Sequence, residues 1–69
     1  MYRLDVVFDG ALEEVEEFTN YDEVWPRWNE FLTELETNYF YQEWSISLYD
    51  ERTEPPELIT YHYNDGEGF

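Results

Sequence analysis

The chain has no cysteine and no lysine, and its 69 residues include only three glycines and three prolines. Without cysteine, neither a disulfide framework nor a thiolate zinc site can form. No apolar run approaches the roughly 20 residues that a membrane-spanning helix needs. The N-terminal residues enter a strand-like pattern at once, without the basic segment and apolar run of a signal peptide. We therefore expect a single small domain in the cytoplasm, without disulfides.

Negative charge is what the chain has in excess. Eighteen acidic residues face three arginines, which gives a formal net charge of -15. Disordered acidic tails lack aromatic residues, whereas 22% of this chain is aromatic, so we expect a folded acidic domain. Such charge suits binding of a basic surface, solubility at high salt, or attraction of cations. Phosphate backbones and anionic lipids are repelled, so we expect neither direct nucleic-acid binding nor membrane binding.

One amphipathic helix is predicted for the stretch from Tyr21 to Phe40. Its apolar residues recur at steps of three and four, which places them on one face. These residues are Val24, Trp25, Trp28, Phe31, Leu32, Leu35 and Tyr39. The opposite face carries Glu23, Arg27, Glu30, Glu34 and Thr37. Asn20 and Asp22 are candidate N-caps, and Asn38 is a candidate stop signal.

Three segments have strand patterns. Residues 2–8 and 40–49 alternate between apolar and polar side chains, and residues 58–63 are rich in β-branched and aromatic residues. The polar segment 50–56 ends in two prolines, so it is predicted to connect the last two strands as a hairpin loop.

Residues 11–18 fit two interpretations. Leu12, Val15 and Phe18 step by three with glutamate pairs between them, so helix period fits better than strand period. A short helical segment is therefore predicted. The competing interpretation is a β-hairpin, because Asp9-Gly10 directly before the segment is a strong hairpin signal.

Together these segments predict an α+β domain over residues 1–63. A small three-stranded antiparallel sheet would carry the main helix and the short helical segment on one face, in the order β-α-α-β-β. Residues 64–69 are predicted to be a flexible acidic tail.

Catalytic and metal-binding patterns are weak. Ser45, Ser47 and His62 are the only serines and the only histidine, and both serines alternate with apolar residues as the solvent side of a strand does. The tail from Asn64 to Glu67 lacks the ligand spacing of a calcium loop. We therefore expect no enzyme, no cofactor and no metal site.

The arrangement of the carboxylates is the remaining pattern. Glu30 and Glu34 are one helical turn apart, about 6 Å along the axis, so rows of such side chains can approximate duplex phosphates. Exposed tyrosines would add apolar anchors. The predicted partner-binding residues are Glu13, Glu14, Glu16, Glu17, Glu30, Glu34, Asp50, Glu51 and Glu54, with Tyr21 and Tyr49 as anchors.

In size, charge, absence of cysteine and α+β pattern, the chain resembles small acidic proteins that phages and plasmids encode against host defence or repair enzymes. These include DNA-mimicking anti-restriction proteins, inhibitors of uracil-DNA glycosylase and anti-CRISPR proteins. No motif aligns, so no functional residue is carried over. The resemblance implies a non-enzymatic inhibitor that occupies the basic DNA- or RNA-binding surface of a host defence or DNA-processing protein in the host cytoplasm.

Two other hypotheses stay open. The acidity would serve solubility in a halophile, or the chain would be an adaptor for a basic protein such as a polymerase subunit. Monomer and homodimer are both compatible with the sequence, because one sheet face cannot cover all of Tyr41, Tyr49, Tyr61 and Tyr63.

Overall fold

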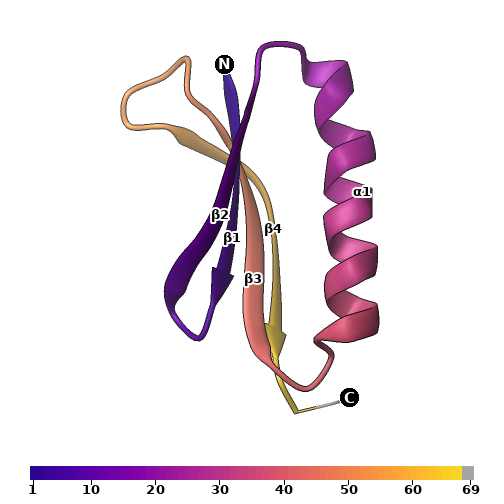
Figure 1. Ribbon diagram of the computed structural model, residues 1–69. Helices are drawn as coiled ribbons and strands as arrows, with labels where there is room; N and C mark the ends of the chain where they lie inside the picture. The colour runs from indigo at the N-terminus through magenta and orange to yellow at the C-terminus, as the bar shows by residue number, and fades with distance from the viewer. Residues whose placement is uncertain (68–69) are drawn as a thin grey trace.

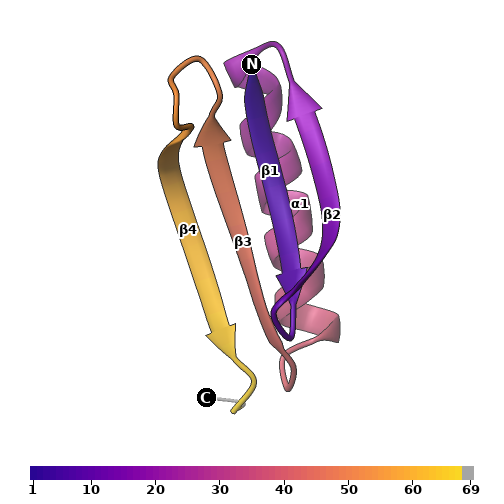
Figure 2. The same cartoon turned by 90° about the vertical axis from the view of Figure 1, so that its left-hand side faces the viewer.

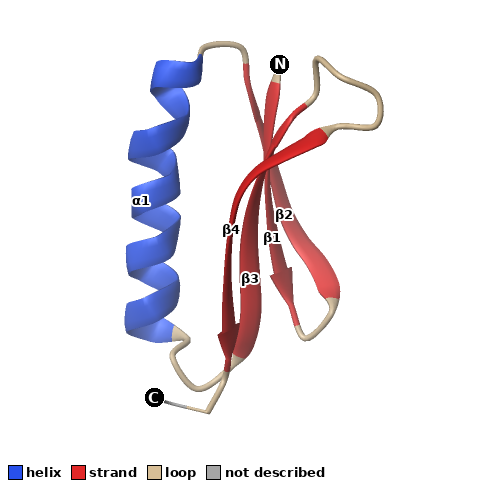
Figure 3. Cartoon of the chain, turned by 180° about the vertical axis from the view of Figure 1, so that it is seen from behind, coloured by secondary structure: helices blue, strands red, loops and turns tan. Residues whose placement is uncertain are grey.

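The computed structural model describes residues 1–67 as a four-stranded antiparallel sheet with one helix against one of its faces (Figure 1). The elements are β1 (Tyr2–Phe8), β2 (Ala11–Phe18), α1 (Tyr21–Asn38), β3 (Glu43–Asp50) and β4 (Glu57–Asp65). The strand order β2-β1-β3-β4 makes β1 and β3 the inner strands. The view from behind shows the helix as one layer and the sheet as the other (Figure 3). The predicted α+β class is confirmed.

The short helical segment predicted for residues 11–18 is wrong, because these residues form strand β2. The predicted three strands and the order β-α-α-β-β are therefore also wrong, and the observed order is β-β-α-β-β. Asp9 and Gly10 have φ angles of 49° and 81° and form a two-residue turn between Phe8 and Ala11. Two positive φ angles match the right-handed twist of the flanking strands, so the turn favours a hairpin.

A β-bulge accounts for part of the helix-like spacing within β2. Leu12 pairs with Val7 and Glu14 pairs with Val6, so Glu13 is the extra residue of the bulge. The bulge places Leu12 and Val15 on the same sheet face although they are three residues apart. The spacing of three between Leu12 and Val15 thus results from the bulge, whereas Phe18 pairs with Tyr2 and lies on the helix side of the sheet.

Helix α1 begins and ends close to the predicted positions. The Asn20 side chain accepts a hydrogen bond of 2.9 Å from the Asp22 N–H, which caps one of the free donors of the first turn. At the other end the Tyr39 N–H donates to the Leu35 carbonyl at 2.9 Å. Pro26 removes one donor of the second turn without ending the helix.

The core lies between α1 and the two inner strands. The buried apolar side chains are Leu4 and Val6 from β1, Val24, Trp28, Phe31 and Leu35 from α1, and Trp44, Ile46 and Leu48 from β3. Burial of each such side chain contributes about 1.5–3 kcal/mol. The indole N–H of Trp44 donates to the Tyr39 carbonyl at 3.0 Å, so this core residue also fixes the chain just after the helix.

Strand β4 extends through Asp65, so the predicted tail of residues 64–69 overlaps its end. The Asn64 amide donates to the carbonyls of Phe40 and Gln42 at 2.9 and 2.8 Å, and thereby ties β4 to the α1–β3 loop. Residues 68–69 of the predicted tail lie outside the described residues.

The sheet face opposite α1 is not covered by any other part of residues 1–67. It exposes apolar side chains from both edge strands, among them Leu12, Val15, Tyr61 and Tyr63, with 46–58% of their surface accessible. Within the described part of the chain, no helix is both long enough and apolar enough to cross a membrane.

Candidate partner-binding site

All three arginines are paired with carboxylates of the chain itself. The pairs are Arg3 with Asp5 and Glu51, Arg27 with Glu16 and Glu30, and Arg52 with Asp50. All 18 acidic side chains lie within the described residues 1–67, where five have an arginine partner and the other 13 do not. The negative charge is thus presented to solvent with little local neutralisation.

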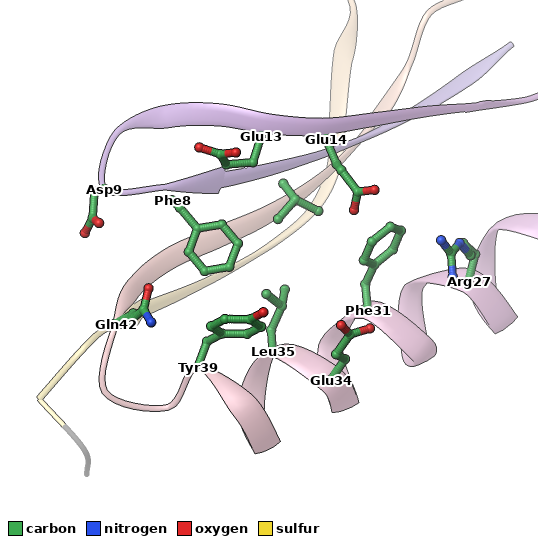
Figure 4. Close-up of a pocket in the computed structure, with 11 residues that line it drawn as sticks. Phe8, Asp9, Glu13, Glu14, Arg27, Phe31, Glu34, Leu35, Tyr39 and Gln42 are labelled. Atoms are coloured by element: carbon green, nitrogen blue, oxygen red, sulfur yellow. The ribbon is translucent and has the colours of Figure 1, made fainter.

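Part of this charge lines a groove between the β1–β2 hairpin and α1, which we call the β2–α1 groove. Its cavity has a volume of about 540 Å³. Asp9, Glu13 and Glu14 line the hairpin side, and Glu34 lines the helix side (Figure 4). The floor is apolar and consists of Val6, Phe8, Phe31, Leu35 and Tyr39.

The residue types on β2 explain why the groove stays open. Glu14 and Glu16 pair with Val6 and Leu4, so their side chains lie on the helix side of the sheet. A carboxylate without a partner is costly to bury, so Glu14 cannot pack against α1 as an apolar residue would, whereas Glu16 meets α1 through Arg27. The helix lies behind β1 and β2 when the sheet is viewed from the other side (Figure 2). The cavity lies at the end of this interface near the β1–β2 turn, because Asp9 of that turn and Tyr39 and Gln42 after α1 line it.

Arg27 joins the two walls at the other end of the groove. Its Nε and Nη2 donate to the two carboxylate oxygens of Glu16 at 2.9 and 2.7 Å, and its Nη1 donates to Glu30 at 3.3 Å. The guanidinium carbon lies 4.2 Å from the centre of the Phe31 ring. Hydrogen bonding to Glu16 raises the pKa of Arg27 above its usual value, so the residue stays charged.

The structure brings together five of the predicted partner-binding residues. Glu13, Glu14 and Glu34 line the groove, whereas Glu16 and Glu30 are held by Arg27 at its end. The sequence pattern places Arg27 as an interruption of an acidic stripe, and the structure shows it as a cross-link between helix and strand.

The remaining predicted carboxylates lie elsewhere. Glu17 lies opposite Arg3 in the register of β1 and β2, on the sheet face that α1 does not cover. Asp50 and Glu51 lie at the opposite end of the sheet from the β1–β2 turn, and Glu54 follows them in the loop. Hydrogen bonds from Arg52 lower the pKa of Asp50 to about 2. These residues do not form one continuous surface with the groove.

The two predicted tyrosine anchors are separated from the groove and from each other. Tyr21 packs against Tyr2 and Trp25 with ring centres 5.1 and 5.6 Å away, and 40% of its surface remains exposed. Tyr49 lies on the open sheet face, where the Arg3 guanidinium carbon is 4.7 Å from its ring centre.

Eight of the residues that line the groove were not among the predicted site residues, and Asp9, Phe8 and Tyr39 are three of them. Asp9 is positioned by the two-residue turn, so the Asp-Gly dipeptide could have placed it beside the β2 glutamates once a hairpin was assumed. The rings of Phe8 and Tyr39 pack edge to face at 5.2 Å, a contact that depends on the tertiary structure.

The residues considered for catalysis are divided between the two sheet faces. Ser45 and Ser47 pair with Tyr63 and Tyr61 on the open face, whereas His62 pairs with Ile46 on the helix side. Residues 1–67 also contain no group of three or more histidine, aspartate or glutamate side chains arranged to hold a metal ion.

Comparison of the sequence with protein-family models finds no match, and comparisons with curated proteins and with solved structures find no significant match. Function is therefore inferred from the chemistry and geometry of the chain's own residues.

Proposed function

We propose that this chain is a non-enzymatic inhibitor that acts as an acidic nucleic-acid mimic. It would occupy the basic DNA- or RNA-binding surface of a host defence or DNA-processing protein, such as a CRISPR effector, a restriction enzyme or a repair enzyme. The observation that carries the proposal is the retention of 13 carboxylates without an arginine partner on the small fold of residues 1–67.

The spacing of the acidic side chains along β2 and α1 is compatible with mimicry. Glu14 and Glu16 are two residues apart on one side of β2, about 6.7 Å along the strand. Glu30 and Glu34 are about 6 Å apart along the helix axis. Phosphates of one duplex strand rise about 3.4 Å per residue along the helix axis, and their separation along the strand is larger. In each pair one carboxylate, Glu14 or Glu34, has no arginine partner, whereas Glu16 and Glu30 are held by Arg27, so the free charge offered to a basic groove comes from Glu14 and Glu34.

Electrostatics then determines how such an inhibitor binds. Opposite fields on the two partners accelerate association, and screening by salt weakens it. The Debye length is only about 8 Å at physiological ionic strength, so only carboxylates close to the interface contribute strongly. Binding should therefore depend on which carboxylates are changed and not on net charge alone.

The experiment is competition with duplex DNA. The chain is used to capture proteins from a bacterial lysate at low salt, and the bound proteins are identified and challenged with excess duplex. We expect nucleic-acid-binding proteins that are released by duplex DNA and by high salt. A captured protein that stays bound in excess duplex would favour the adaptor hypothesis instead and refute mimicry.

A charge-reversal series tests the surface. The triple variant Glu13→Lys, Glu14→Lys, Glu34→Lys should weaken inhibition of the identified target by roughly tenfold or more, equivalent to about 1.4 kcal/mol or more. Circular dichroism before and after the changes checks that the fold is retained.

The matched control is Glu36→Lys, Glu57→Lys, Glu67→Lys, which changes the net charge by the same amount at exposed positions outside the groove. Equal losses in the two triple variants would show that only total charge matters.

Unfolding of the unchanged chain in dilute buffer, with recovery only in molar salt, would support the halophile hypothesis.

A further inference from the structure

The β2–α1 groove differs from a plain acidic surface because it has an apolar floor. Phe8 and Tyr39 form an edge-to-face pair with ring centres 5.2 Å apart, and both rings line the cavity. Duplex DNA does not present an apolar cleft of this kind between its two rows of phosphates. The groove therefore suits a ligand that is cationic at its tip and apolar along its length.

Arg27 shows how the same interface holds a guanidinium. Its charged group lies over the Phe31 ring at 4.2 Å and donates to a carboxylate of β2, Glu16, and to one of α1, Glu30. An aromatic face with flanking carboxylates is the environment that guanidinium groups prefer, because they stack on rings and donate in a planar fork.

The remainder of the groove repeats this composition without a cation. Glu13 and Glu14 project from the β2 side and Glu34 from the helix side, and the rings of Phe8 and Tyr39 lie next to them toward the β1–β2 turn (Figure 4). Among the described residues that line the cavity, Arg27 is the only basic one, and Glu16 and Glu30 already hold it.

We propose that the open part of the β2–α1 groove binds an arginine side chain from the basic surface of the partner protein. The aliphatic stem packs on Phe8 and Tyr39, and the guanidinium is held between Glu34 and the β2 glutamates. This inference rests on the proposed function, because it assumes a partner with a basic surface. It adds an anchor that duplex DNA itself lacks.

Charge complementarity identifies the occupant. A phosphate or a lipid headgroup is anionic and would be repelled by these walls. A second copy of this chain is a poor donor, because each of its three arginines is already held by its own carboxylates. A partner that binds nucleic acid carries arginines for phosphate contacts, and these are free when no nucleic acid is bound.

The test is a titration of the full chain, followed by amide chemical shifts, with a triarginine peptide as the probe. A trilysine peptide serves as the comparison of equal charge, and a tricitrulline peptide serves as the comparison of similar shape without charge. We expect shifts centred on Phe8, Asp9, Glu13, Glu34 and Tyr39, tighter binding of triarginine than of trilysine, and no binding of tricitrulline. Equal affinity for triarginine and trilysine, or shifts spread evenly over all acidic residues, would overturn the proposal.

Two neighbouring helix residues give a matched pair of variants. Glu34→Gln removes a groove carboxylate, whereas Glu36→Gln removes one that lies 3.8 Å from His62 on the β4 side. We expect Glu34→Gln to weaken triarginine binding by about three- to tenfold, as the loss of one charge-assisted contact does. Glu36→Gln should change it by less than about twofold, since exposed charges at a distance are screened.

The two proposals fail in different ways. If the chain inhibits a DNA-binding protein in competition with duplex, but Glu34→Gln and Glu36→Gln weaken inhibition equally, the groove inference is wrong and mimicry stands. If captured partners are not displaced by duplex DNA, mimicry is wrong whatever the peptide result.

Discussion

Arg27 is the polar link between α1 and β2, and its removal is the perturbation whose size follows most directly from the structure. We consider Arg27→Met, which keeps an unbranched apolar side chain over Phe31 but removes the charge. Glu16→Gln removes the charge of the main partner and keeps its shape. The double variant completes a thermodynamic cycle that isolates the interaction between these two residues.

The expected magnitude is modest because both side chains are partly solvated. Arg27 and Glu16 are 37% and 31% exposed, so water and salt screen their attraction. Exposed pairs contribute about 0.2–1 kcal/mol, and the two-point geometry at 2.7 and 2.9 Å places this pair toward the upper end. The contact of the guanidinium with Phe31 adds about 0.5–1 kcal/mol, but it is lost in both backgrounds and cancels in the cycle.

We therefore expect Arg27→Met to destabilise the fold by about 1–2 kcal/mol and the coupling energy to be about 0.5–1 kcal/mol. In a domain of this size, each kcal/mol lowers Tm by about 4–8 °C. Urea unfolding followed by circular dichroism provides the free energies, and the coupling should decrease as salt is added.

The control is Arg52→Met, which makes the same charge change at a residue 65% exposed whose partner, Asp50, is only two positions away in the chain. It should destabilise the fold less than Arg27→Met does. A coupling energy below about 0.3 kcal/mol, the usual limit for independent sites, would refute the role of Arg27 as a cross-link between strand and helix.

Two further predictions concern the ends of the strands. Gly66→Ala should lower the free energy of unfolding more than Gly10→Ala does. Both glycines have φ of 81°, a conformation that costs alanine about 1–2 kcal/mol. Only at Gly66 would the new Cβ also lie 2.9 Å from the backbone of Gln42. Equal shifts in Tm for the two variants would contradict the close approach of Gly66 to the α1–β3 loop. Acid unfolding should show the contribution of Asp50 to stability. Hydrogen bonds from Arg52 lower the pKa of Asp50 to about 2, against about 3.9 in an unfolded chain. The stabilisation by ionised Asp50 is therefore complete above pH 4 and is lost as pH falls toward 2. The stability difference between the native chain and Asp50→Asn should shrink over that interval, and a constant difference from pH 7 to pH 2 would show that the pKa is not lowered.

Local sequence patterns correctly predicted α1 and β3, whose apolar residues recur at regular spacing. The helix period from Val24 to Leu35 corresponds to the buried face of α1, and Asn20 caps the helix. The alternation of Trp44, Ile46 and Leu48 corresponds to the buried side of β3, since side chains of a strand alternate between faces wherever no bulge intervenes.

Strand β2 is where local patterns failed. Its spacing of three predicts a helix, but the turn at Asp9 and Gly10 and the bulge at Glu13 fit it to the edge of β1. Pairing with β1 supplies backbone hydrogen bonds that outweigh the helical preference of a glutamate-rich segment. Neither the bulge nor the choice of β1 as an inner strand is visible in residue spacing.

The sequence by itself determined the charge of the chain, its lack of disulfides and the amphipathic character of α1, because these depend only on composition and on neighbours three or four residues apart. The tertiary structure decided which carboxylates lie together. In the fold, Glu13 and Glu14 lie opposite Glu34, and Asp50 lies apart from them. Arg27 of α1 contacts Glu16 of β2 and thereby joins the helix to the strand. The physical reason is that electrostatic and aromatic contacts act over a few ångströms in space, and only the pairing of β2 with β1 brings these distant parts of the chain within that range.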